Sequence, residues 1–140
     1  MIDYYNIPIR EINNIKNGAD FITPQGIAIP NKRLTTPPNP QRSYAYCSDT
    51  VYDESIVQYI KGVDLLYHEA TFSDSEIARA KKTGHSTARQ AAEIAKLAEV
   101  KKLIIGHFSS RYSDLTVLLK EAQAVFPNTE LAEEKKTVDL

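Results

Sequence analysis

The spacing of apolar positions divides the chain near Ser43. Before that residue, prolines and glycines recur too closely for a long helix or strand. The strand-like signal in this part is residues 27–29, where two isoleucines flank an alanine. We therefore predict an irregular arm or connecting segment over residues 1–42 and a folded domain over residues 43–140.

After Ser43, short apolar runs alternate with stretches of helical periodicity, and the two patterns predict strands and helices in turn. The predicted strands cover residues 44–47, 65–67, 103–105, 129–132 and 137–140. The predicted helices cover residues 53–60, a segment from Ser73, residues 88–98, and a segment from Ser113 to Phe126. Helices between short strands are typical of an α/β domain.

Side chains that satisfy free backbone N–H groups mark three of these helix starts. Ser73–Glu76 and Thr87–Gln90 both have the spacing of a capping box. Ser113 is the candidate cap of the last helix. The alanine-rich helix after Thr87 has side chains small enough to lie close against a sheet.

Composition fits one globular domain and limits the classes of function. The chain has 140 residues, a hydrophobic fraction of 42% and a net charge of −1, so charge gives no argument for nucleic-acid binding. Its apolar runs fall short of the roughly 20 residues of a membrane span, and its first residues lack the features of a secretory signal. Cys47 is the single cysteine, and without an internal disulfide a reducing cytoplasm is expected.

Ionisable residues gather where the predicted strands end. Asp49 follows the first strand. His68 and Glu69 follow the second strand, and His107 follows the third, after a glycine that permits an unusual backbone turn. His85 lies just before a capped helix, whose N–H groups favour an anion. Because ligands of α/β sheets bind at the carboxyl ends of strands, we expect a functional site at this edge.

Each of these residues also has an ordinary structural interpretation. Asp49 can cap the next helix, His68 can be a hydrogen-bonded core histidine, and Glu69 can form a surface ion pair. His85 can be a turn residue, and Cys47 a small core residue. Cys47 also lacks a second cysteine or a histidine at metal-ligand spacing, so we do not count it as a ligand.

Four short strings occur in one order and are more specific together than their parts. They are YCSDT (Tyr46–Thr50), HEATF (His68–Phe72), GHSTA (Gly84–Ala88) and GHFSSRY (Gly106–Tyr112). Together they resemble the later motifs of the ribonuclease Z branch of the metallo-β-lactamase superfamily. The fold implied by this resemblance is α/β, the C-terminal half of an αββα sandwich with a mixed sheet flanked by helices.

The resemblance also implies roles for the residues at the strand ends. Asp49 would bridge two metal ions, usually zinc, and His107 would bind one of them, which polarises a phosphate and activates a bound water. His85 would act near the scissile phosphate as proton donor or charge stabiliser, supported by Glu69. His68 would be structural. Further phosphate contacts are expected from Ser86, Thr87, Ser109, Ser110 and Arg111.

The family's main metal motif, HxHxDH, is absent from this sequence. A dinuclear zinc site needs roughly four to five ligands per ion, and Asp49 and His107 are too few. We therefore expect the isolated chain to bind zinc weakly or not at all. The resemblance places the missing motif in the N-terminal half of the same enzyme, which becomes an expected partner. Half a sandwich would also leave an apolar sheet face open, so we expect a homodimer or a larger assembly.

Three functions compete on these observations. The leading one is removal of the 3′ trailer of precursor tRNA by a metal-dependent endonuclease, of which this chain is the C-terminal part. The second is a catalytically incomplete fragment or assembly module that has the fold without the metal site. The third is another phosphodiesterase of the superfamily, against which the GHSTA string argues. A phosphoacceptor domain using Asp49 is remote, because no acidic cluster accompanies it.

Overall fold

The computed structural model describes residues 4–138 and divides the chain into two compact units, one up to Pro40 and the other from Gln41. The division lies two residues before the boundary predicted from the sequence. In the described residues, no helix has the length and apolar character to cross a membrane.

The first unit folds around a small core of its own. Its elements are η1 (Ile9–Glu11), α1 (Ile12–Lys16), β1 (Phe21–Ile22), β2 (Ala28–Ile29) and α2 (Asn31–Leu34). Strands β1 and β2 pair antiparallel, and Ile15, Phe21 and Ile29 are buried together. The side chain of Asn31 donates hydrogen bonds to the carbonyl oxygens of Ile15 and Ala19. The unit is therefore more ordered than the irregular arm we predicted.

The second unit is built on a four-stranded parallel sheet. Its strands are β3 (Tyr44–Cys47), β4 (Leu65–Glu69), β5 (Lys102–Gly106) and β6 (Thr129–Leu131), and they lie side by side in chain order. The first four predicted strands are confirmed. Residues 137 and 138 are not in a strand, and residues 139–140 of the fifth predicted strand lie outside the described residues.

Helices and 3-10 turns connect the strands. They are η2 (Glu54–Ile56), α3 (Val57–Ile60), η3 (Asp74–Glu76), α4 (Ile77–Thr83), α5 (Ala88–Leu97) and α6 (Thr116–Gln123). The capping box of Thr87 and Gln90 is confirmed. The one predicted at Ser73 is wrong, because Glu76 bonds instead to Tyr112. The cap predicted at Ser113 is also wrong, since Asp114 accepts the backbone N–H of Thr116 in that turn.

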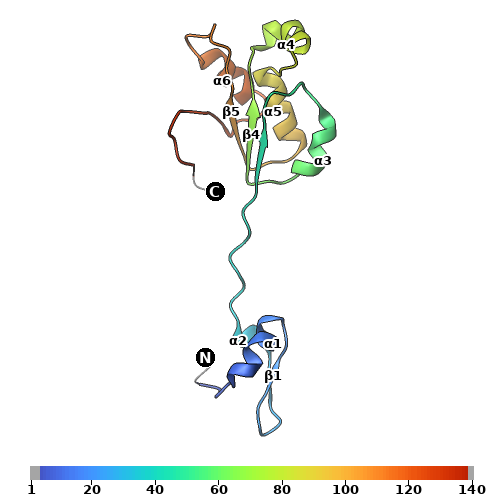
Figure 1. Ribbon diagram of the computed structural model, residues 1–140, viewed down its shortest axis with the longest axis vertical. Coiled ribbons are helices and arrows are strands. Elements are labelled where there is room, and N and C mark those ends of the chain that lie inside the picture. The colour runs from blue at the N-terminus through green and yellow to red at the C-terminus, as the bar shows by residue number, and fades with distance from the viewer. Residues whose placement is uncertain (1–3, 139–140) are drawn as a thin grey trace. The chain divides into compact units, whose positions relative to one another are not determined.

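One face of the sheet is buried against these helices. The strand order follows the chain, and right-handed crossovers then place the connecting helices on the same face. Leu66, Leu103 and Ile105 point to that face and are fully buried in one cluster with the alanines of α5. In Figure 1, α5 runs alongside β4 and β5. The predicted α/β architecture, a sheet with packed helices, is confirmed. The expected mixed sheet is not found among the described residues of this unit, because its four strands all pair in parallel.

The opposite face, which we call the tyrosine face, carries Tyr44, Tyr46, Leu65, Tyr67 and Ile104. Tyr44 and Tyr46 are 52% and 61% exposed. The rings of Tyr46 and Tyr67 stack with centroids 4.6 Å apart. A cavity of about 470 Å³ lies over this face and is bordered by the segment after β6. All-parallel sheets are normally covered on both faces. Among the described residues, no helix or second sheet of this unit covers the tyrosine face, and only the segment after β6 borders it.

Candidate metal and catalytic site

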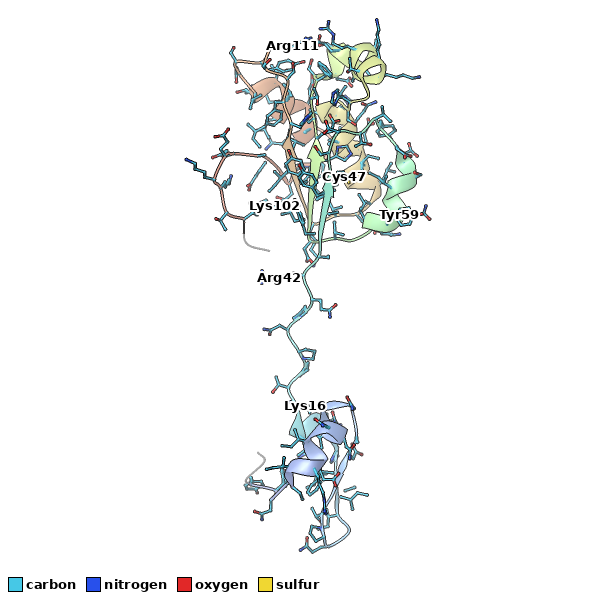
Figure 2. The ribbon with its side chains drawn as sticks, in the orientation of Figure 1. Lys16, Arg42, Cys47, Tyr59, Lys102 and Arg111 are labelled. Atoms are coloured by element: carbon cyan, nitrogen blue, oxygen red, sulfur yellow. The ribbon has the colours of Figure 1, made fainter. Side chains whose placement is uncertain are left out.

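The carboxyl ends of the strands bring the predicted site residues together. Asp49 comes two residues after β3, Glu69 is the last residue of β4, and His107 follows β5 directly. His85 comes from the loop between α4 and α5. Figure 2 shows Lys102 at the start of β5 and Arg111 in the loop beyond its end, at opposite ends of the sheet. The strand topology therefore places residues from four separate strings at one edge.

Asp49, His85 and His107 form a cluster of metal-ligand type. One ligand atom of each lies within 4.8 Å of those of the other two. His107 Nε2 is 3.1 Å from Asp49 Oδ1, and the two imidazole rings have centroids 5.4 Å apart. Asp49 and His107 are exposed and His85 is half-buried, so the cluster is open to solvent and to a ligand.

The backbone turns sharply at two of these residues. Asp49 and His107 have φ angles of 51° and 59°, in the left-handed region that few non-glycine residues occupy. We had expected the glycine before His107 to make this turn. That expectation is wrong, because Gly106 is in β5 with no positive φ. A Cβ on Gly106 would lie 2.3 Å from the hydroxyl oxygen of Tyr67, so this position is glycine for space.

Glu69 is a buried carboxylate, and both of its oxygens accept hydrogen bonds. Oε1 accepts from the backbone N–H of Thr50 at 2.8 Å and lies 2.9 Å from His85 Nδ1. Oε2 accepts from the Thr71 hydroxyl at 2.7 Å and from the Ser86 N–H at 3.1 Å. Burial raises the pKa of Glu69, but these hydrogen bonds outweigh it and hold the pKa below its ordinary value. Glu69 is therefore a fixed negative charge beside His85.

His68 and Cys47 lie apart from the cluster. His68 is fully buried, its Nδ1 is 2.8 Å from the Glu69 carbonyl oxygen, and its Nε2 has no hydrogen-bond partner in the described residues. Burial lowers the pKa of His68, which favours a neutral ring. Cys47 packs against the main core, and burial raises the pKa of its thiol. Both have the environment of structural residues.

The residues expected to contact phosphate have different environments. Ser86 and Thr87 are fully buried. The hydroxyl of Ser86 donates to the Thr50 carbonyl at 2.7 Å, and that of Thr87 caps α5, so both are already used inside the protein. Arg111 pairs with Glu76 at 3.2 Å and lies over the Phe72 ring. Ser109 is half-buried and Ser110 exposed, and their contact with phosphate stays a prediction.

Sequence reasoning missed Thr71 as a site residue. Its hydroxyl oxygen is 2.7 Å from Glu69 Oε2 and 3.0 Å from His107 Nδ1. Thr71 stands in the HEATF string, two residues after Glu69. Spacing along the chain gives no sign that it meets His107, which is 36 residues away.

The donor set suits a metal ion of the zinc type. Two imidazoles and one carboxylate are ligands that zinc accepts, and three protein ligands with an open position are typical of a catalytic zinc site. Histidine ligands usually hydrogen-bond through their second nitrogen to an oxygen. Here the Nδ1 atoms of His85 and His107 meet Glu69 and Thr71 respectively. The residues present therefore fit one metal ion, with fewer ligands than a dinuclear site requires.

Comparisons with known proteins agree with this geometry. Residues 33–108 match the family model described as the beta-lactamase superfamily domain. The chain is 60% identical over 140 residues to a ribonuclease Z of Bacteroides thetaiotaomicron and 59% identical to one of Bacteroides fragilis. It spans only 44% and 46% of the length of these relatives.

A solved structure supports the same fold. The metallo-beta-lactamase fold protein YhfI from Bacillus subtilis matches with a TM-score of 0.62 and 26% identity, over 66% of this chain and 38% of that one. The resemblance inferred from the four strings is thereby confirmed. The chain belongs to the beta-lactamase superfamily and is similar over its whole length to a part of ribonuclease Z.

Proposed function

We propose that this chain is the C-terminal part of a metal-dependent endonuclease that removes the 3′ trailer of precursor tRNA. The observation that carries the proposal is the meeting of Asp49, His85 and His107 at the carboxyl edge of the sheet. The ribonuclease Z relatives indicate RNA as the substrate class. We also propose a cytoplasmic location, which the single free thiol of Cys47 supports.

Each site residue has a distinct task in this proposal. Asp49 and His107 would hold zinc, which when bound polarises the phosphate and lowers the pKa of a water. His85 lies in the same cluster, and in this proposal it is not a ligand but the donor of a proton to the departing 3′ oxygen. Glu69 accepts a hydrogen bond from His85 Nδ1 at 2.9 Å and stabilises the protonated ring.

The remainder of the longer protein would complete the metal site. The family site holds two zinc ions, and with His85 as proton donor the cluster among the described residues leaves Asp49 and His107 as ligands. We therefore infer that zinc binds weakly to this chain alone. The tyrosine face would pack against the remaining part, because Tyr44 and Tyr46 leave large apolar surface exposed there. That part would bring further ligands to the same edge.

Reconstitution tests this proposal. The chain is mixed with a separately purified N-terminal half of a ribonuclease Z, and zinc content and precursor-tRNA cleavage are measured. We expect cleavage by the mixture, little zinc on the chain alone, and loss of cleavage in Asp49→Ala and His107→Ala. Lys96→Ala, at an exposed position of α5 on the side of the sheet opposite the tyrosine face, is the control and should cleave normally.

Two outcomes would contradict the proposal in different ways. Two tightly bound zinc ions on the chain alone would refute the incomplete site. A mixture that forms a complex and binds zinc but leaves precursor tRNA intact would refute the nuclease. The second function, a catalytically incomplete assembly module, is favoured for the chain by itself, because its described residues supply only three clustered ligands.

A further inference from the structure

The hydroxyl of Thr71 lies at the meeting point of three groups. It is 2.7 Å from Glu69 Oε2, 3.0 Å from His107 Nδ1 and 3.0 Å from the His107 carbonyl oxygen. Thr71 is 6% exposed, so water is largely excluded from these contacts. A threonine hydroxyl has one proton to donate and two lone pairs to accept with.

The group to which Thr71 donates its single hydroxyl hydrogen determines which ring nitrogen of His107 carries a hydrogen. The carboxylate of Glu69 and the carbonyl of His107 can only accept hydrogen bonds. If the Thr71 proton pointed at His107 Nδ1, the 2.7 Å contact with Glu69 would join two acceptors without a hydrogen. Donation to a carboxylate is short and strong, and 2.7 Å fits it. The hydroxyl therefore donates to oxygen, and a hydrogen on His107 Nδ1 completes the 3.0 Å contact between that nitrogen and the hydroxyl oxygen.

We infer that Thr71 is a positioning residue, which fixes His107 in the Nδ1–H form and leaves its Nε2 lone pair directed at Asp49 for a shared cation. In the other neutral tautomer of His107, Nε2 carries the hydrogen and donates it to Asp49 Oδ1, 3.1 Å away. That alternative would block the atom needed as a ligand. The importance of Thr71 for cleavage rests on the proposed function, whereas its control of the His107 tautomer does not.

The same carboxylate also holds the other histidine of the cluster. Glu69 Oε1 meets His85 Nδ1 directly at 2.9 Å, and Oε2 reaches His107 through Thr71. Thr71 is anchored in turn, because its carbonyl oxygen accepts the backbone N–H of Ser109 at 3.1 Å. One buried charge thus orients both imidazoles, and Thr71 is the link to the second.

Nitrogen-15 NMR of the histidine rings tests this inference on the purified chain without metal. The spectra are recorded at alkaline pH and show which ring nitrogen of each histidine carries the hydrogen. We expect His107 as Nδ1–H in the unaltered chain and in Thr71→Ser, which keeps the hydroxyl. Thr71→Val should convert it to Nε2–H. Thr116→Val, which removes an exposed hydroxyl bonded to Asp114, is the matched control.

The effect on metal binding gives a second readout. Zinc titration of the reconstituted mixture should show about 10- to 100-fold weaker binding for Thr71→Val, as for other lost partners of metal-bound histidines. Thr71→Ser should restore it. A His107 that is Nε2–H in the unaltered chain would overturn the inference, even if Thr71→Val failed to fold. An Nε2–H tautomer of His107 would not contradict the nuclease proposal. A mixture that fails to cleave precursor tRNA would not contradict the tautomer assignment.

Discussion

At the residue scale, the Tyr67 side chain explains why position 106 is a glycine. The Tyr67 ring lies over the Gly106 backbone, where a Cβ would meet three of its atoms within 2.8 Å. Gly106→Ala should lower the free energy of unfolding by about 1–3 kcal/mol, because the ring must leave its stack on Tyr46 or the strand must shift. Urea denaturation measures the change.

A double-mutant cycle isolates the cause at this pair. In a Tyr67→Ala background the same Gly106→Ala change should destabilise by less than about 1 kcal/mol, since nothing then occupies the space. Equal losses in both backgrounds would show that the clash with Tyr67 is not the reason for the glycine.

At the scale of elements, Asp64 joins the starts of three strands. It stands just before β4, accepts from the Ser43 N–H at 2.7 Å before β3, and pairs with Lys101 at 2.6 Å before β5. The hydrogen bonds from Lys101 and Ser43 lower the pKa of Asp64 from 3.8 to about 2. The folded pKa is below the unfolded one, so the stabilisation is present above pH 3.8 and is lost as the pH falls toward 2.

Asp64→Asn tests this contribution. Chain and variant should differ most in unfolding free energy above pH 3.8, and the difference should shrink steadily as the pH falls toward 2. Urea titrations at a series of pH values measure it. A difference that stays constant across that range would mean that the charge of Asp64 contributes nothing.

At the scale of the whole molecule, the tyrosine face predicts how the second unit behaves when it is alone. Its exposed aromatic surface should drive self-association into a homodimer or larger assembly at micromolar concentration. Tyr46→Lys puts a charge on the exposed aromatic part of this face, on the edge strand β3, and should weaken association by about tenfold or more. Sedimentation velocity measures both. Tyr59→Lys, at an 81% exposed tyrosine on α3, is the matched control.

Sedimentation also separates the two uses proposed for this face. A monomeric profile of the unaltered chain would refute self-association. If the added N-terminal half displaced the second copy, and Tyr46→Lys weakened that complex as well, both partners would be shown to use the same surface.

The sequence by itself determined the elements of the second unit and the residues at the strand ends. Apolar runs and helical spacing are local patterns, and Asp49, Glu69 and His107 are placed by the strands that they end or follow. The tertiary structure alone decided which side chains share hydrogen bonds. Thr71 meets His107, and Ser86 meets Thr50, across 36 residues in each case.

The same physical reason explains the predictions that were wrong. Glu76 accepts a hydrogen bond from Tyr112, which is 36 residues away, and does not form the predicted capping box. Gly106 leaves room for the ring of Tyr67 on the neighbouring strand. A polar side chain can form its hydrogen bond with a residue that is distant in sequence and close in the fold. A position can require glycine because a side chain of a neighbouring strand occupies the space that a Cβ would need. Strand pairing and crossover geometry set both, and neither is encoded in the spacing of residues along one segment.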